Sequence, residues 1–116
     1  MKYNSQQPAK ILPPEAHIAA KQGELAELEK ELQGNDRESV LTERDEHGWQ
    51  VLHQGVAGGN EEVVKLLVSN GADVNARTHG GYGETPLRIA EKRFGDHNPI
   101  VKYLKEVGAL SIGPEL

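Results

Sequence analysis

Apolar residues in the middle of the chain recur at the spacing of an α-helix. The resulting stripe consists of Val63, Val64, Leu66 and Leu67. It predicts a helix that stops at Gly71, because glycine accepts the left-handed conformation at a helix C-terminus without a Cβ penalty. A shorter helix is predicted over 49–57, and Gly58-Gly59-Asn60 breaks it. The stretch 45–77 is therefore predicted to fold as a turn, a short helix, a tight turn, a longer helix and a return loop.

Similar patterns flank this central stretch. Upstream, residues 15–22 predict a short helix that Gly23 closes, and residues 24–33 predict a second helix with leucines on one side and charged residues on the other. Downstream, Thr85-Pro86 supplies a typical N-cap and first residue of a helix, and the segment 100–104 carries another apolar stripe. The chain is thus predicted to be a succession of helix–turn–helix units.

The central stretch resembles an ankyrin repeat of about 33 residues, through the pattern DxxG…LHxxxxxG…VVxLL…GADVNA. Leu52-His53 stands at the expected distance from the VVKLL and GADVNA motifs. Two positions depart from the family pattern: Gln50-Val51 replaces the usual Thr-Pro, and Gly55-Val56 replaces the usual Ala-Ala. The resemblance extends over 15–109.

The resemblance implies an all-α fold, an ankyrin-repeat α-solenoid of helix-turn-helix units joined by short β-hairpin loops. We expect a flexible N-terminal segment over 1–12 and an ankyrin-repeat domain over 13–112, followed by a C-terminal tail over 113–116. The repeats are expected at about 13–44, 45–77 and 78–112. Within the first repeat, 34–39 is expected to be a long connection and 40–44 to replace the usual DVNAR loop. In the segment 110–116, Ile112 and Leu116 are expected either to fold back as a lid over the last helix pair or to belong to a free tail.

Incomplete motifs predict modest stability. In the family, the Thr hydroxyl and the His imidazole of TPLH join neighbouring turns by hydrogen bonds. The second repeat keeps His53 but has Gln50, and the third keeps Thr85 but has Arg88. We therefore expect a thermal midpoint below about 80 °C.

Composition and charge limit the functional classes. The chain has 116 residues, 36% of them hydrophobic, and no Cys, so it lacks both a disulfide framework and a thiolate zinc site. The sequence shows no apolar run long enough for a membrane span and no signal peptide, so we expect an intracellular protein, in the cytoplasm rather than at a membrane. The net charge of −5 disfavours nucleic-acid binding. The charge is uneven: the N-terminal end is predicted to be acidic and the C-terminal end mildly basic.

The residues give no indication of catalysis. None of the five His forms an HxH or HExxH pair, no Ser has a base at catalytic spacing, and no Cys is present as a nucleophile. The carboxylates fall mostly on predicted exposed faces, whereas acid–base chemistry needs a perturbed pair in a cleft. We therefore expect no enzyme activity, no metal and no cofactor.

The resemblance implies where a partner binds, since the family recognises partners with hairpin tips and with the exposed side of each first helix. By position, this surface includes Lys21, Gln22, Glu46, His47, Trp49, Ala57, Gly58, His79, Tyr82, Glu84, Lys92 and Arg93.

Trp49 and Tyr82 are the candidate anchors of this surface, because aromatic residues bury large areas at low entropic cost. The alternative for Trp49 is that it packs along the neighbouring hairpin as part of the scaffold. Ala57 and Gly58 are expected to leave a shallow floor that suits an extended acidic or aromatic peptide.

Asn75 is a candidate for modification. Leu67…Asp73-Val74-Asn75-Ala76 resembles the pattern of ankyrin repeats that are substrates for asparaginyl hydroxylation in animals. The alternative is that Asn75 satisfies backbone groups in the hairpin.

The function implied by the resemblance is recognition of a protein or peptide, without catalysis. One alternative is an accessory or regulatory module excised from or appended to a larger enzyme. A minimal or designed scaffold is a weaker alternative, because the altered loop lengths favour a natural origin. We expect a monomer, with end-to-end pairing of open stacks as the alternative.

Overall fold

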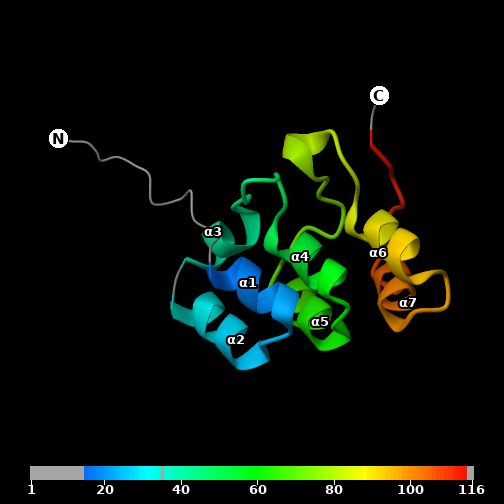
Figure 1. The fold of residues 1–116 in the computed structure, drawn as a ribbon. Coiled ribbons are helices and arrows are strands. Elements are labelled where there is room, and N and C mark those ends of the chain that lie inside the picture. Colours follow the sequence, from blue (N-terminus) through cyan, green and yellow to red (C-terminus); the bar gives the residue numbers. More distant parts are fainter. Residues whose placement is uncertain (1–14, 35, 115–116) are drawn as a thin grey trace.

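The computed structural model describes residues 15–34 and 36–114 and contains seven α-helices in that part of the chain (Figure 1). In chain order they are α1 (Glu15–Gln22), α2 (Leu25–Gly34), α3 (Arg37–Thr42), α4 (Val51–Gly58), α5 (Glu61–Ser69), α6 (Pro86–Phe94) and α7 (Pro99–Glu106). A 3₁₀ turn, His79–Gly81, lies in the loop before α6. The predicted flexible segment 1–12 lies outside the described residues. The all-helical fold is confirmed.

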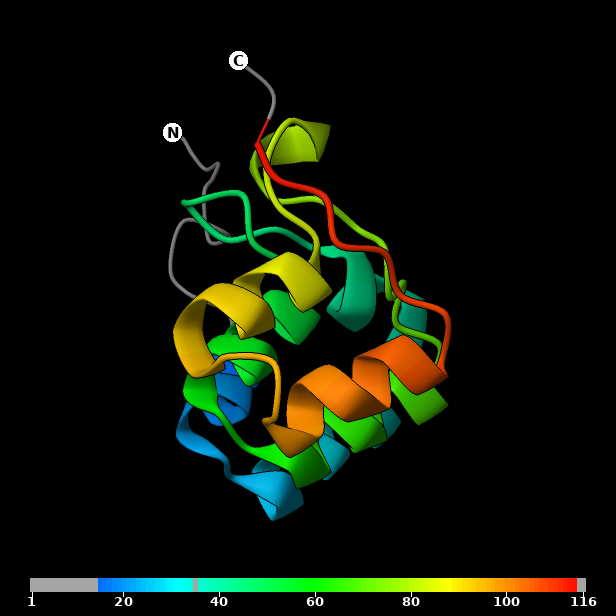
Figure 2. The same ribbon diagram turned by 90° about the vertical axis from the view of Figure 1, so that its right-hand side faces the viewer.

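Three antiparallel helix pairs stack side by side. The first helices, α1, α4 and α6, form one layer, and the second helices, α2, α5 and α7, form the other (Figures 1 and 2). The loops before α4 and before α6 project together from one side of the stack (Figure 1). Within the described ranges these loops contain hydrogen-bonded turns and no regular strand. The predicted α-solenoid of helix-turn-helix units is therefore confirmed.

Small residues allow the first helices to approach closely. Ala16, Ala19 and Ala20 of α1 are buried at 3% exposure or less. At Gly58, a Cβ atom would stand 2.2 Å from the backbone oxygen of Lys21, so only glycine fits where α4 passes the end of α1. The second layer fills the core with larger side chains, including Leu28, Leu67 and Leu104, each fully buried.

The boundaries of α4 differ from the predicted 49–57. Gln50 is the N-cap, with extended backbone angles, and Trp49 lies in the loop before the helix. The backbone N–H of Gln50 donates to Nδ1 of His53 at 2.9 Å, which closes the first turn from outside the helix. At the other end, Gly59 takes a left-handed conformation with φ of 77°.

The expectation of a loop throughout 34–44 is wrong, because most of that segment forms α3. Asp36 caps this helix: its carboxylate accepts from the N–H of Glu38 at 3.2 Å and from the hydroxyl of Ser39 at 3.0 Å. Leu41 then joins the core at 6% exposure. A local cap and one buried leucine are enough to turn the long connection into a helix.

The C-terminal segment packs on the last repeat, which agrees with the first of the two alternatives stated for the tail. The Thr85 hydroxyl donates to the carbonyl of Leu110 at 2.6 Å and accepts from the N–H of Ile112 at 3.1 Å. Arg77 donates to the carbonyl of Gly113 at 2.9 Å. Figure 2 shows this segment (red) running beside the α6–α7 pair towards the projecting loops. Leu116, the other residue of that expectation, lies outside the described part of the chain.

No helix in the described ranges is both long enough and apolar enough to cross a membrane.

Candidate partner-binding surface

A row of three open hollows runs along the side of the stack where the loops project. The central hollow has a volume of about 410 Å³, and the hollows beside it have about 180 and 270 Å³. We call the central one the main hollow. Its lining residues come from α1, the loop before α4, α4 itself, the loop before α6, and α6; they are Lys21, His47, Trp49, Gln54, Ala57, His79 and Arg93.

The structure brings together nine of the twelve residues expected on the partner surface. Six of them line the main hollow, namely Lys21, His47, Trp49, Ala57, His79 and Arg93. Glu84 and Lys92 line the hollow on the α6 side, and Glu46 lines the hollow on the α1 side. Gln22, Gly58 and Tyr82 line none of these three.

The sequence interpretation missed several lining residues. Gln54 lines two of the hollows and lies one helical turn before Ala57, so the i, i+3 spacing was a sufficient signal for it. Asp45 and Ile18 line the α1-side hollow, and Ile89 lines the α6-side hollow. Ile89 is 3% exposed and belongs to the core, so no surface pattern marks it.

Asp45 fixes the loop before α4. Its carboxylate accepts from the N–H of His47 at 2.8 Å, from the N–H of Trp49 at 3.0 Å and from the side-chain amide of Gln54 at 2.8 Å. Burial favours the neutral acid, but these hydrogen bonds outweigh it and lower the pKa of Asp45. The ionised carboxylate therefore ties the backbone of the loop to the side chain of Gln54 on α4.

Trp49 belongs both to the scaffold and to the surface. Its carbonyl accepts from the N–H of Asp45 and from Nε2 of His17, each at 2.9 Å. Its half-buried ring packs on the core, 6.0 Å from the His53 ring and tilted by 59°. The exposed part of the same side chain lines both the main hollow and the α6-side hollow. The two alternatives stated for Trp49 thus coexist in one residue.

The loop before α6 is braced around Thr78. The Thr78 carbonyl accepts from the N–H groups of Gly81 and Gly83, and its N–H donates to the carbonyl of Glu84. At Gly83 a Cβ atom would overlap the Thr78 hydroxyl, so glycine is required there. The loop also contacts its neighbour, since the N–H of His79 donates to the Gly48 carbonyl at 3.0 Å.

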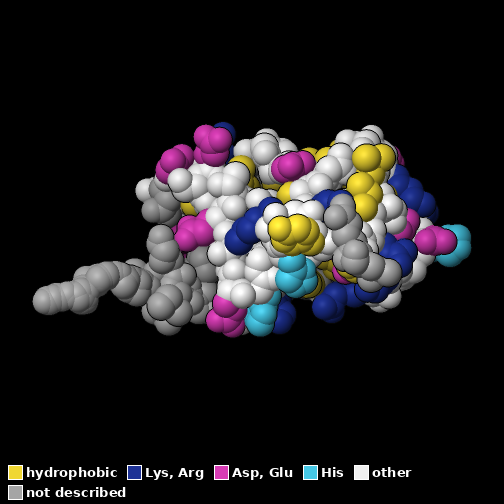
Figure 3. Space-filling model, turned by 90° about the horizontal axis from the view of Figure 1, so that it is seen from above, with side chains coloured by type: hydrophobic (Ala, Val, Ile, Leu, Met, Phe, Trp, Pro, Cys, Tyr) yellow, Lys and Arg dark blue, Asp and Glu magenta, His cyan; other side chains and the backbone are white. Residues whose placement is uncertain are grey.

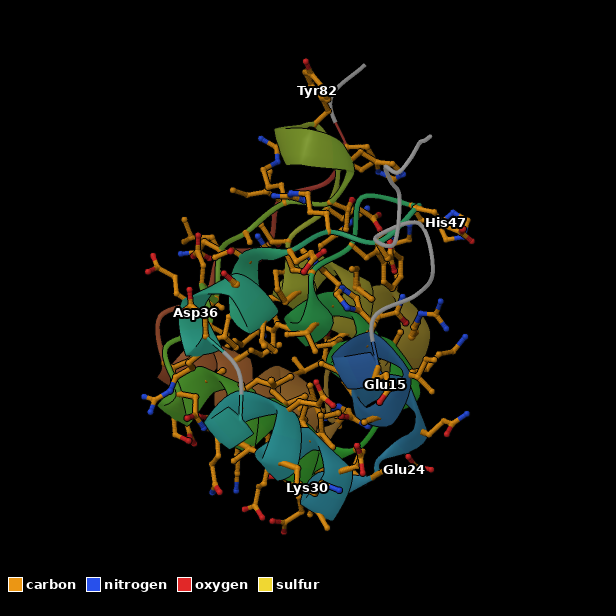
Figure 4. All side chains as sticks on the ribbon, turned by 90° about the vertical axis from the view of Figure 1, so that its left-hand side faces the viewer. Glu15, Glu24, Lys30, Asp36, His47 and Tyr82 are labelled. Atoms are coloured by element: carbon orange, nitrogen blue, oxygen red, sulfur yellow. The ribbon has the colours of Figure 1, made fainter. Side chains whose placement is uncertain are left out.

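Tyr82 stands at the tip of this loop. Its side chain is 68% exposed, and Figure 4 shows it pointing away from the helices. His47 is displayed on the neighbouring loop in the same view. The braced loop therefore presents Tyr82 beyond the row of hollows rather than inside it.

Gln22 and Gly58 lie at the ends of α1 and α4. Both residues are exposed. For Gly58 the structure gives a packing reason, the close approach to the backbone of Lys21. Their expected contact with a partner stays a prediction.

Asn75 has a structural role that its half-buried position explains. Its side-chain oxygen accepts from the N–H of Leu110 at 2.7 Å, so it ties the second repeat to the C-terminal segment. Its own N–H donates to Asp73 at 2.9 Å. The hydrogen bonds agree with the backbone-satisfying alternative, and hydroxylation stays a prediction.

Among the described residues, one group of carboxylates is close enough together to be considered as metal ligands. The carboxylates of Glu15, Glu27 and Glu31 lie within 4.8 Å of one another on the N-terminal repeat. Figure 4 shows Glu15 on that outer end of the stack, among other charged side chains. This group shares no residue with the three hollows. Exposed acidic clusters of this kind are common without an ion.

Helix pairs stacked in two layers, with loops projecting from one side, define a repeat protein of the α-solenoid class. The chain belongs to the ankyrin-repeat family: the family model for ankyrin repeats in three copies matches residues 16–112. Ankyrin repeats are generally protein–protein interaction modules.

Known relatives and a solved structure agree with this assignment. The chain is 40% identical over 87 residues to Notch-regulated ankyrin repeat-containing protein A of Danio rerio, covering 74% of each chain. It is 46% identical over 63 residues to protein phosphatase 1 regulatory subunit 27 of Homo sapiens, covering 53% of this chain and 38% of that protein.

A solved complex of a predatory endopeptidase from Bdellovibrio bacteriovorus with an immunity protein contains a similar chain. The match has a TM-score of 0.70 and 32% identity, covering 82% of this chain and 46% of that one. The chain thus spans less than half the length of two of these three proteins.

Proposed function

We propose that this protein recognises a partner protein with the row of hollows between its projecting loops and the first-helix layer, and that it has no catalytic activity. The observation that carries the proposal is the convergence of nine predicted surface residues, from three repeats, on adjoining hollows. Concave surfaces with a few convergent polar groups are where ligands bind most often.

Preorganisation of this surface supports the proposal. Asp45 fixes one projecting loop through three hydrogen bonds, and Thr78 braces the other. A surface that is already rigid loses little conformational entropy when a partner docks, so more of the contact energy appears as affinity.

The groups that line the main hollow favour binding over chemistry. Ordinary acid–base catalysis needs a titratable pair with a free proton-transfer path. The nearby carboxylate of Asp45 is instead occupied by two backbone N–H groups and one amide. We therefore propose a non-catalytic module that acts in the cytoplasm on a protein or an unfolded segment of one.

An accessory role towards an enzyme is the second candidate. One relative is a phosphatase regulatory subunit by name, and the similar solved structure is an endopeptidase complex. These names describe those proteins. For this chain they support the idea that the partner is an enzyme, either separate or part of a longer chain.

The test is a comparative pull-down with a steric block and a matched control. Ala57→Arg places a long side chain in the main hollow, which Ala57 lines. Ala26→Arg makes the same change at an exposed position of α2, on another face. Circular dichroism first establishes that both variants are folded. Lysate of the source cells is passed over each immobilised protein, and the retained proteins are quantified by mass spectrometry.

We expect at least one protein to be retained by the wild type and by Ala26→Arg, and to be reduced about tenfold or more by Ala57→Arg, as for loss of a central contact. Equal retention by all three proteins would contradict binding through the main hollow. If nothing is retained above background, the proposal of protein recognition is itself contradicted.

Modification of Asn75 is proposed separately. Its test is the intact and fragment mass of the protein purified from its source, where one added oxygen atom on Asn75 is the expected signature. An unmodified Asn75 in material from cells competent for hydroxylation would contradict it.

A further inference from the structure

We propose that the partner segment bound in the main hollow is an acidic stretch of polypeptide, with an apolar side chain between two carboxylates. This inference rests on the proposed function and specifies the chemistry of its ligand. It is carried by the sign of the charges around the hollow, which is opposite to that of the molecule.

The main hollow is lined by Lys21, Arg93 and two histidines, and by no carboxylate. This is unusual for the chain, which has 18 acidic and 13 basic residues and a net charge of −5. Figure 3 views the molecule from the side of the projecting loops. It shows Asp and Glu side chains mainly over one half, Lys and Arg mainly over the other, and two histidines near the middle.

The carboxylates nearest to the hollow are already engaged. Asp45 accepts three hydrogen bonds from its own loop and Gln54. Glu84 is paired with Lys92 at 2.6 Å, and Glu46 lies 3.3 Å from Nε2 of its neighbour His47. A basic segment would find no free carboxylate inside the main hollow to receive it.

The two cations, by contrast, are available. Among the described residues, neither Lys21 nor Arg93 has an ion pair or a hydrogen-bonded side-chain partner, and both are exposed. Lys92, one residue before Arg93, shows the difference because Glu84 neutralises it. Arg93 adds a planar guanidinium that binds a carboxylate through two N–H groups.

The positions of Lys21 and Arg93 on the stack set the distance between the two carboxylates of the ligand. Lys21 is on α1 and Arg93 on α6, with α4 between them. Neighbouring helix axes lie about 8–10 Å apart, so the two cations extend from helices roughly 16–20 Å apart. Their long side chains both reach the same hollow and shorten that gap. We take about 13 Å between bound carboxylates, which is four residues of extended chain.

The floor between the cations is partly apolar. The exposed part of the Trp49 side chain and the methyl group of Ala57 form its apolar part, and Gln54 adds a side-chain amide beside them. One aliphatic or aromatic side chain between the two carboxylates covers it. A nucleic acid fits the site less well, because a polyanion extends past the hollow and comes within about 10 Å, the Debye length at 0.1 M salt, of other acidic residues of a chain whose net charge is −5.

The probe is a nine-residue peptide of serine and glycine, acetylated and amidated, with glutamate at its third and seventh positions and leucine at its fifth. One control peptide has lysine in place of both glutamates, and another has serine in place of leucine. Each is titrated into isotope-labelled protein, and the backbone amide signals are followed by nuclear magnetic resonance. The indole N–H of Trp49, the single tryptophan, reports directly on the hollow.

Two charge-reversal variants make the test local. Arg93→Glu and Lys102→Glu change the net charge equally, but Lys102 lies on α7 and does not line the main hollow. We expect the acidic peptide to shift the signals of Trp49, Gln54 and Ala57 with a Kd below about 1 mM at low salt. Affinity is expected to fall about fivefold or more with Arg93→Glu or with added salt, and less than about twofold with Lys102→Glu.

The inference is overturned if the lysine peptide binds as well as the acidic one, or if the two variants weaken binding equally. It is also overturned if the acidic peptide shifts only signals outside the hollow, or none at peptide concentrations well above 1 mM, about the weakest affinity expected. In each case, a partner protein retained by the wild type and lost with Ala57→Arg would leave the proposed function standing. If neither the peptide titration nor the pull-down gives its expected result, both proposals are contradicted.

Discussion

His17 and His53 occupy equivalent positions in the first two repeats, yet they are bonded differently. Each donates from Nε2 to a carbonyl of the following repeat loop, His17 to Trp49 at 2.9 Å and His53 to Ala76 at 2.8 Å. Nδ1 of His53 also accepts from the N–H of Gln50. Nδ1 of His17 is buried and has no partner in the described part of the chain.

The sequence explains this difference. The residue three positions before His53 is Gln50, which has a backbone N–H, whereas the residue three positions before His17 is Pro14, which has none. Pro14 therefore offers no backbone N–H from which Nδ1 of His17 could accept a hydrogen bond.

The largest expected loss of stability is at the junction between the second and third repeats, where both ring nitrogens of His53 are hydrogen-bonded. His53→Ala should lower the free energy of unfolding by about 4 kcal/mol, because it removes a side chain with 0% exposure and leaves the Gln50 N–H and the Ala76 carbonyl without their partner. Urea unfolding followed by circular dichroism measures it. A loss below about 1 kcal/mol would mean that the hydrogen bonds contribute little here.

The pH dependence should follow His53 as well. Desolvation by burial lowers the pKa of His53 from 6.5 to about 4, despite the hydrogen bond to Ala76. The unfolded chain therefore takes up a proton that the folded chain excludes, and the free energy of unfolding should fall by about 3 kcal/mol between pH 6.5 and 4. Asp45 acts in the same direction at the acid end of this window, because hydrogen bonds lower its pKa in the folded protein and the stabilisation they give is lost as the pH falls.

Urea unfolding at a series of pH values measures this decline, and His53→Ala is the control. Most of the decline between pH 6.5 and 4 should be missing in the variant. An unchanged decline would assign it to other groups.

A smaller loss is expected at the first junction. His17→Ala also removes a buried imidazole and its bond to Trp49, but it frees no second donor, so the loss should be about 2.5 kcal/mol. Comparison with His53→Ala by the same unfolding assay sharpens the contrast. Equal losses would show that the unpaired Nδ1 makes no difference.

The junction between the third repeat and the C-terminal segment is formed by the Thr85 hydroxyl, and it should contribute least to the free energy of unfolding. Thr85→Val keeps the shape of the side chain but removes its bonds to Leu110 and Ile112. It also removes the N-cap bond from the Arg88 N–H, and the combined cost is expected to be about 1.5 kcal/mol. Hydrogen exchange of the Ile112 amide, which donates to this hydroxyl, should speed up in the variant. Unchanged exchange would mean that the segment is held by other contacts.

Much of the fold could be predicted from local patterns. The apolar stripe of 63–67, the Thr85-Pro86 start and the glycine stops specify three helix pairs, and the structure confirms them. Helix α3 was not predicted, because alignment with the ankyrin pattern made its segment a loop. The local signal that indicates this helix is its cap, in which Asp36 accepts from the Ser39 hydroxyl. The bonds of Thr85 to the C-terminal segment join residues 25 and 27 positions apart, beyond the reach of any short motif.

The candidate site was predictable in composition more than in arrangement. Register alone placed nine of twelve expected residues around adjoining hollows. Tyr82 lies beyond them because the loop before α6 is extended and braced by Thr78, a geometry set by hydrogen bonds rather than by repeat length. The dual role of Trp49 and the free charge of Lys21 and Arg93 required the three-dimensional contacts.

Site-specific photo-cross-linking tests directly whether the main hollow contacts a partner protein. A photoreactive amino acid replaces Ala57, which lines the main hollow, or Ala26, which is exposed on α2. After irradiation in source-cell lysate, cross-linked proteins are identified by mass spectrometry. Recognition through the main hollow predicts a discrete protein adduct from position 57, abolished by Arg93→Glu, and none of that protein from position 26. The same adduct from position 26 alone, or from both positions regardless of Arg93, would contradict recognition through the main hollow.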